Sequence, residues 1–110
     1  MISRQKLGAA VLVVGLVAAL PEYADCVLPP APSKVPDGVS ASEQEMLMAM
    51  KTLKQYNGDV EVYLKCLEFE AKQNRMTATE QRNKHNAAIT QLEKIATQFN
   101  EQVRVYKAKG

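Results

Sequence analysis

The chain has 110 residues, and 14 Lys and Arg stand against 12 Asp and Glu, a formal net charge of +2 at pH 7. This length predicts one small domain. The nearly equal numbers of basic and acidic residues argue against a nucleic-acid partner. Two cysteines and one histidine leave few of the side chains that nucleophilic catalysis and zinc sites require.

The N-terminus has the order of segments that is typical of a secretory signal peptide. Arg4 and Lys6 precede an uncharged apolar run at 7–20. At roughly 14 residues, this run is shorter than the ~20 that a membrane-spanning helix needs. We therefore expect a signal peptide at 1–19 and a chain that works outside the cytoplasm.

The processing of this segment leaves several alternatives open. Cleavage after Ala19 fits the small-residue preference, and cleavage as late as Ala24 is a second choice. An uncleaved segment would tether the protein to the membrane. A lipoprotein acylated at Cys26 is a further alternative, although Asp25 occupies the position where such proteins carry a small residue.

The segment 20–40 predicts an extended strap rather than a helix or a central strand. Four of its prolines fix φ near the polyproline II value: Pro29, Pro30, Pro32 and Pro36. About 15 residues of strap reach ~46 Å in that conformation. The helix that follows rises about 38 Å before it reaches Cys66. The strap is therefore long enough to return along the helix and bring Cys26 to Cys66.

The two cysteines predict a disulfide. An even number of cysteines in a small exported chain is usually paired, and two cysteines allow only one intramolecular bond, Cys26 to Cys66. In the chain-entropy model, closing a loop of this size stabilises the fold by about 4 kcal/mol. For a small core this contribution is large.

The segment 41–110 predicts a helical hairpin, with a first helix at about 41–74. Either Ser40 with Glu43 or Ser42 with Glu45 forms a capping box at its start. Apolar residues at three- and four-residue steps line one face of this helix. They are Met46, Met50, Leu53, Tyr56, Val60, Tyr63, Leu64, Leu67 and Ala71.

A second apolar stripe lies beside the first and consists of Val62, Cys66 and Phe69. We expect the strap to lie on this stripe, with Val62 and Phe69 on either side of the disulfide. Gly58 falls in the middle of the helix, where a glycine costs roughly 1 kcal/mol against alanine. We expect a bend or a soft spot there, and not a break.

A second helix is expected at about 78–107, after a short turn and a capping box of Thr77 and Glu80. Its apolar face carries His85, Ala88, Ile89, Leu92, Ile95, Ala96, Phe99, Val103 and Tyr106. The short turn makes the two helices antiparallel neighbours. Their two stripes then match layer by layer, so the predicted fold is all-α, an antiparallel two-helix hairpin of coiled-coil type.

We find no catalytic set in the sequence and expect neither enzyme activity nor a cofactor. Glu68 and Glu70 are interpreted as part of a solvated face. The methionine cluster, which consists of Met46, Met48 and Met50, is the one candidate for metal chemistry, because thioether sulfur suits Cu(I). In it Met46 and Met50 share a face, whereas His85 belongs to the opposite end of the hairpin. The simpler interpretation is that these methionines fill an irregular core end or an interface.

Four features in order resemble small exported proteobacterial proteins of unassigned function. They are Cys26, the proline-rich stretch 29–32, Pro36-Asp37-Gly38, and the Tyr-Leu-x-Cys-Leu-Glu segment at 63–68. The resemblance implies a Gram-negative periplasmic setting and supports the pairing of the cysteines. It implies no activity.

These features together predict a periplasmic or secreted protein that binds or scaffolds through protein-protein contacts. We expect a homodimer, in which two hairpins form four helices, or a partner protein of the envelope. A metal- or small-ligand-binding protein that uses the methionines is the first alternative. A membrane-tethered envelope component is the second, and it requires that the signal segment be retained.

Overall fold

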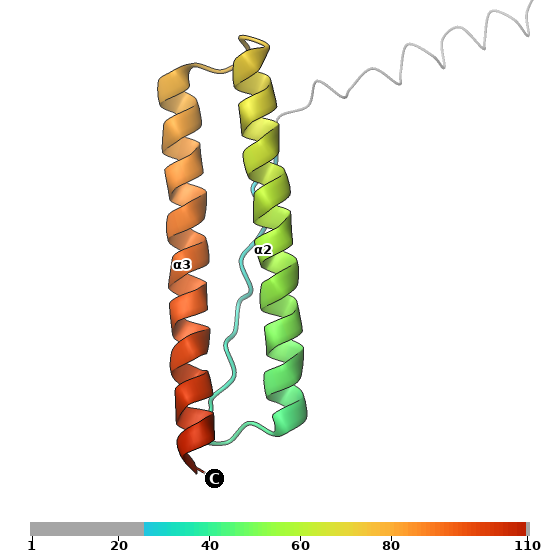
Figure 1. Ribbon diagram of the computed structural model, residues 1–110, viewed down its shortest axis with the longest axis vertical. Coiled ribbons are helices and arrows are strands. Elements are labelled where there is room, and N and C mark those ends of the chain that lie inside the picture. Colours follow the sequence, from blue (N-terminus) through green and yellow to red (C-terminus); the bar gives the residue numbers. More distant parts are fainter. Residues whose placement is uncertain (1–25, 110) are drawn as a thin grey trace, which may run out of the picture.

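The computed structural model describes residues 26–109, which form two long helices joined by a short turn (Figure 1). Helix α2 spans Glu43–Lys72 and helix α3 spans Ala78–Lys109. The helices lie side by side and antiparallel, so the predicted all-α hairpin is confirmed, with every helix end within two residues of the expected one. The expected signal peptide at 1–19 lies outside the described residues.

Helix α2 begins with the second of the two predicted capping boxes. The Ser42 hydroxyl accepts a hydrogen bond from the Glu45 backbone N–H at 3.1 Å, and the Glu45 carboxylate accepts one from the Ser42 N–H at 2.7 Å. Two donors that the first turn leaves unpaired are thereby satisfied. From there α2 continues through Gly58 as one uninterrupted helix (Figure 1).

The end of α2 is a Schellman motif with Asn74 in the left-handed region, at φ 61°. The Arg75 N–H donates to the Glu70 carbonyl at 2.9 Å, and the Asn74 N–H donates to the Ala71 carbonyl at 3.0 Å. Asparagine tolerates this backbone conformation better than most residues. The chain reverses within a few residues, and the Thr77 hydroxyl then caps α3 by accepting from the Glu80 N–H at 3.0 Å.

The core consists of two clusters where the predicted stripes of α2 and α3 meet. The larger cluster contains Tyr56, Val60, Tyr63, Leu67, Ala88 and Ile95, and the smaller contains Ala41, Met46 and Phe99. Val60 and Leu67 are buried almost completely. Leu53 packs against both clusters and so joins them into one strip along the hairpin.

The predicted disulfide is present, with 5.7 Å between the Cα atoms of Cys26 and Cys66. Its formation corrects the lipoprotein alternative, because the Cys26 sulfur is bonded to Cys66 and is not free for acylation. From Cys26 the strap runs along the hairpin between α2 and α3 (Figure 1). Ala31 packs against the larger cluster and Val35 against the smaller.

The expected position of the strap on the second stripe is wrong. Val62 remains 69% exposed and Phe69 54% exposed, so the strap covers neither side chain. It lies instead in the groove between the helices, where Pro32, Val35 and Pro36 share a small cavity with side chains of both α2 and α3. The groove is the better position because a strap in it buries its side chains against two helices at once.

The far end of the strap is fixed to α3 at Gly38. The Gly38 N–H donates to the side-chain carbonyl of Gln102 at 2.7 Å. A Cβ on Gly38 would lie 2.2 Å from the Gln102 backbone oxygen, so only glycine allows this approach. Nearby, the Lys109 ammonium donates to the carbonyls of Val39 and Ala41 at 3.2 and 2.8 Å. Both contacts hold the turn that precedes α2 against the end of α3.

Candidate interaction surfaces

The sequence-predicted site residues do not converge on one place in the structure. Met46 is 6% exposed and packs with Ala41 and Phe99, whereas Met50 is 37% exposed. A metal ion bound by both sulfurs would require Met46 to leave its core cluster. Within residues 26–109, no three or more His, Cys, Asp or Glu side chains are grouped so that they could hold a metal ion.

His85 lies on the surface near the turn between the helices, in a shallow cavity that it shares with Leu64, Lys65, Glu68 and Gln81. Leu64 follows Met46 by about 27 Å along α2, at 1.5 Å per residue. His85 is therefore too distant to complete a methionine site. The residue is exposed, although its spacing places it on the apolar face of α3.

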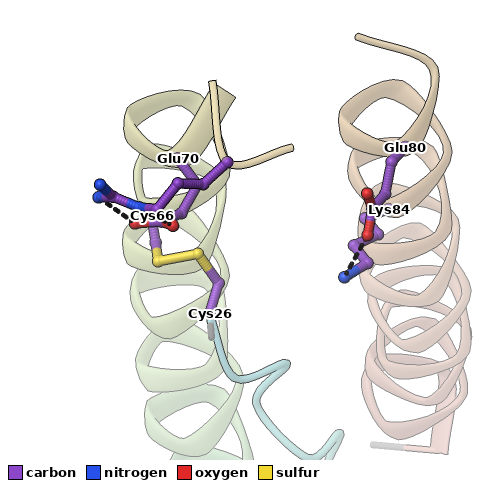
Figure 2. Close-up of a disulfide and its surroundings, with 6 residues drawn as sticks. Cys26, Cys66, Glu70, Glu80 and Lys84 are labelled. Atoms are coloured by element: carbon purple, nitrogen blue, oxygen red, sulfur yellow. Dashed lines mark hydrogen bonds and ion pairs between the residues drawn. A yellow bond between two sulfur atoms is a disulfide. The ribbon is translucent and has the colours of Figure 1, made fainter. Parts of the chain in front are cut away.

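The position of Glu70 differs from the expected one. The side chain was expected on a solvated face, but the residue is only 8% exposed. Its carboxylate accepts two hydrogen bonds from the Arg75 guanidinium, at 2.8 and 3.0 Å. The hydrogen bond from Arg75 lowers the pKa of Glu70 and outweighs the opposing effect of its burial. Figure 2 shows Glu70 one helical turn beyond Cys66, on the same side of α2 as the disulfide.

The ion pairs on the two sides of the turn between α2 and α3 have different roles. The Arg75 guanidinium also lies 5.6 Å from the centre of the Phe69 ring, within cation–π range. Glu80 pairs with Lys84 at 3.3 Å on the first turns of α3, on the other side of the hairpin (Figure 2). The pair at Glu70 therefore orders the end of α2, and the pair at Glu80 supports the exposed start of α3.

Tyr56 carries the buried hydroxyl that has no hydrogen-bond partner among residues 26–109. The residue is 3% exposed, and burial raises the pKa of its phenol. The Tyr56 side chain packs in the larger core cluster. Tyr56 is therefore a packing residue with a buried polar atom.

Two open clefts border the hairpin, and neither contains a catalytic arrangement. The larger, about 780 Å³, lies between the Pro36 region of the strap and the surface of α3 at Gln98 and Gln102. The second, about 430 Å³, lies on the helix–helix groove at Leu53, Leu92 and Ala96, without strap residues. Both clefts are open and shallow.

The exposed apolar side chains of α2 form a second kind of surface. At its start, Leu47, Met48 and Met50 are 54%, 60% and 37% exposed, and we call these three residues the methionine patch. Surface apolar residues that occur singly need no explanation, but adjacent ones indicate a site of contact. Leu47 and Met48 lie off the buried face of α2, whereas Met50 lies at its edge, one turn after buried Met46.

Comparison with known proteins adds no relative. Neither a family model, nor a curated protein, nor a solved structure matches this chain. The function is therefore inferred from the structure of the chain itself. The structure provides capped helices, a disulfide that ties the strap to α2, and apolar side chains exposed on α2.

The disulfide also bears on where the chain works. Disulfides form and persist in oxidising compartments, and they are rare in the cytosol. Both cysteines of the chain are in this bond. Among residues 26–109, neither helix has the length of apolar sequence that crossing a bilayer requires.

Proposed function

We propose that this chain is a periplasmic or secreted module that binds or scaffolds through protein-protein contacts, with the methionine patch as its contact surface. The observation that carries the proposal is the exposure of Leu47, Met48 and Met50 on the first turns of a capped helix. Methionine side chains are flexible and polarisable, so they adapt to the surface of a partner. The setting outside the cytoplasm is supported by the disulfide and by the signal-like N-terminus.

The partner is either a second copy of the chain or another envelope protein. Pairing two hairpins through their α2 helices would bury both methionine patches and produce the four-helix arrangement that the sequence predicts. Two helices and a strap bury limited apolar area on their own, which favours association. The resemblance to small exported proteobacterial proteins supports the same setting and assigns no activity.

A photo-crosslinking residue at Met48 tests the proposal in exporting cells. We expect a covalent product whose mass identifies the partner, at twice the mass of the chain for a homodimer. The matched control is the same crosslinker at Asn100, which is exposed on α3 near the same end of the hairpin. The proposal fails if Met48 gives no product, or if Asn100 gives the same products in equal yield.

A further inference from the structure

The groove between α2 and α3 is filled on one face of the hairpin and open on the other. On the filled face, Pro32, Val35 and Pro36 of the strap lie against side chains of both helices. On the other face lies the cleft of about 430 Å³, which contains no strap residue. We call it the open groove, and its walls are Leu53, Lys54, Asn57, Leu92, Glu93 and Ala96. A further chain can pack across both helices on this face.

The floor of the open groove is apolar and only partly buried. Leu53, Leu92 and Ala96 form it near the middle of the hairpin, and all three side chains keep part of their surface exposed. Met50 of the methionine patch lies one turn before Leu53 and Lys54, so it borders this groove. Burying the floor against an apolar partner would remove this surface from water and stabilise the fold.

The two walls of the open groove carry opposite charges at the same level. Lys54 comes from α2 and Glu93 from α3, and both are exposed side chains of the same cleft. Among residues 26–109, neither is in an ion pair. Charged residues that border the apolar seam of packed helices determine which partner binds and in which orientation. The positions of Lys54 and Glu93 therefore test what fits the groove.

A second copy of the chain fits these charges when the two-fold axis runs along the hairpin. Such an axis places α2 of each copy against α3 of the other and keeps every residue at its own level. Lys54 of each copy then faces Glu93 of the other, so the contact contains this pair twice. Each helix has antiparallel neighbours, as in a four-helix bundle of two hairpins. No shift of one copy along the other is needed.

The neighbouring positions along the two walls agree with this arrangement. Seven residues before and after Lys54 lie Leu47 and Glu61, and seven residues after and before Glu93 lie Asn100 and Asn86. In the dimer, Leu47 faces Asn100 of the second copy, and Glu61 faces Asn86. No charge at these positions is opposed by a like charge.

The two ends of the hairpin do not oppose the dimer either. Glu43 begins α2 and Lys107 lies in the last turn of α3, so these opposite charges are at the same end. Near the turn, Arg82 is at the level of both Lys65 and Glu68, whose effects on it have opposite signs. The preference for a second copy therefore comes from the middle and the open end of the groove.

We infer that a second copy of the chain occupies the open groove, with the pair of Lys54 and Glu93 formed twice across the two-fold axis. This inference rests on the proposed function, association through protein contacts, and names the partner that covers Leu47 and Met50. It places α2 against α3 of the second copy. Met48 lies two positions from Met50, on the other side of α2, and stays accessible to a different partner.

Charge reversal followed by sedimentation velocity tests the dimer, with protein purified after export. Lys54→Glu should weaken self-association about tenfold, because repulsion replaces attraction at two exposed pairs. Glu93→Lys should have the same effect. The double variant restores both pairs in reversed polarity and should dimerise as the unmodified chain does. The matched control is Lys94→Glu, which changes an exposed lysine outside the open groove and should leave the dimer unaffected.

Mixing the two single variants tests which helices meet. Each variant alone brings like charges together, two glutamates in one case and two lysines in the other. In a mixed dimer, the new glutamate of one chain faces the new lysine of the other, and the unchanged Lys54 faces the unchanged Glu93. An equimolar mixture should therefore sediment as a dimer at a total concentration at which each variant alone is mostly monomeric.

Three results would overturn this inference. The first is an unmodified chain that stays monomeric up to millimolar concentration, and the second is an equal effect of Lys54→Glu and Lys94→Glu. The third is a mixture no more dimeric than its components, which would leave contact between two α2 helices as the alternative.

The crosslinking experiment separates this dimer from the function proposed above. Asn100 faces Leu47 of the second copy, so the crosslinker at Asn100 should give a product of twice the mass of the chain. Met48 lies outside the dimer contact, so its product should differ in mass from that at Asn100. A monomeric chain would refute the dimer and leave a product at Met48 as support for another partner. The two proposals can therefore fail separately.

Discussion

Replacing Gly38 by alanine tests the attachment of the strap to α3 most directly. The added Cβ would lie 2.2 Å from the Gln102 backbone oxygen and 2.9 Å from the Tyr106 nitrogen. Both atoms belong to the backbone of α3, so neither can move aside and the strap must move instead. Overpacking of this kind costs about 1–3 kcal/mol. The displaced strap also loses the hydrogen bond from the Gly38 N–H to Gln102, which is worth about 1 kcal/mol.

The expected loss in the free energy of unfolding is therefore about 2–4 kcal/mol for Gly38→Ala. Urea denaturation followed by far-UV circular dichroism measures it. Gly58→Ala is the matched control, because a Cβ there meets nothing within 4 Å and α2 is continuous at that position. Alanine is the better helix former, so this variant should gain about 1 kcal/mol.

The opposite signs of these two changes are the essential result. Gln102→Ala separates the two contributions to the Gly38 effect, since it removes the side-chain hydrogen bond without adding a Cβ to the strap. It should cost only about 1 kcal/mol. If Gly38→Ala unfolds at the same urea concentration as the unmodified chain, the strap does not pack on α3 as described.

Three further predictions follow from the same contacts. Replacing both Cys26 and Cys66 by serine should lower the free energy of unfolding by about 4 kcal/mol, since the bond closes a loop between residues 40 apart; an unchanged melting temperature would contradict this. Tyr56→Phe should leave stability unchanged or raise it by up to about 1 kcal/mol, because the buried hydroxyl has no partner among residues 26–109; a large loss in calorimetry would reveal a hydrogen bond. Because Arg75 lowers the pKa of folded Glu70, this pair stabilises the protein above the ordinary glutamate pKa and stops doing so as the pH falls through the lowered value. Urea midpoints measured against pH should thus converge for the unmodified chain and Glu70→Gln in acid, and a constant difference would argue against the pair.

The sequence was sufficient to predict the hairpin and the disulfide. Helical periodicity identifies the buried faces, and the stripe of α2 meets that of α3 because a short turn forces the helices together. The capping residues Ser42 and Thr77 mark the two helix starts. With two cysteines in the chain, one intramolecular pairing was possible.

The path of the strap was not predictable in the same way. Periodicity shows that Val62, Cys66 and Phe69 share a face, but not the side from which the chain reaches Cys66. That side depends on the groove, which exists only once α2 and α3 have packed. The close approach at Gly38 likewise depends on the backbone of α3, more than sixty positions away in sequence.

The buried position of Glu70 was also missed, for a different reason. A glutamate near a helix end normally contacts water, and the periodic pattern of α2 gave no sign of its partner. Arg75 lies beyond the helix, and the left-handed residue Asn74 turns the chain so that the guanidinium reaches back to the carboxylate. A basic residue directly after an asparagine at a helix end was the available signal.

The position of the disulfide has a mechanical consequence. Tension applied ahead of Cys26 would pass directly through the sulfur bridge into α2 at Cys66, and the strap would carry none of it. After reduction, the same load would run through the strap and peel it from the groove one contact at a time, ending at Gly38. With the disulfide intact, a pull on the chain ahead of Cys26 is thus resisted by helix α2. Without the disulfide, the same pull is resisted by the extended strap.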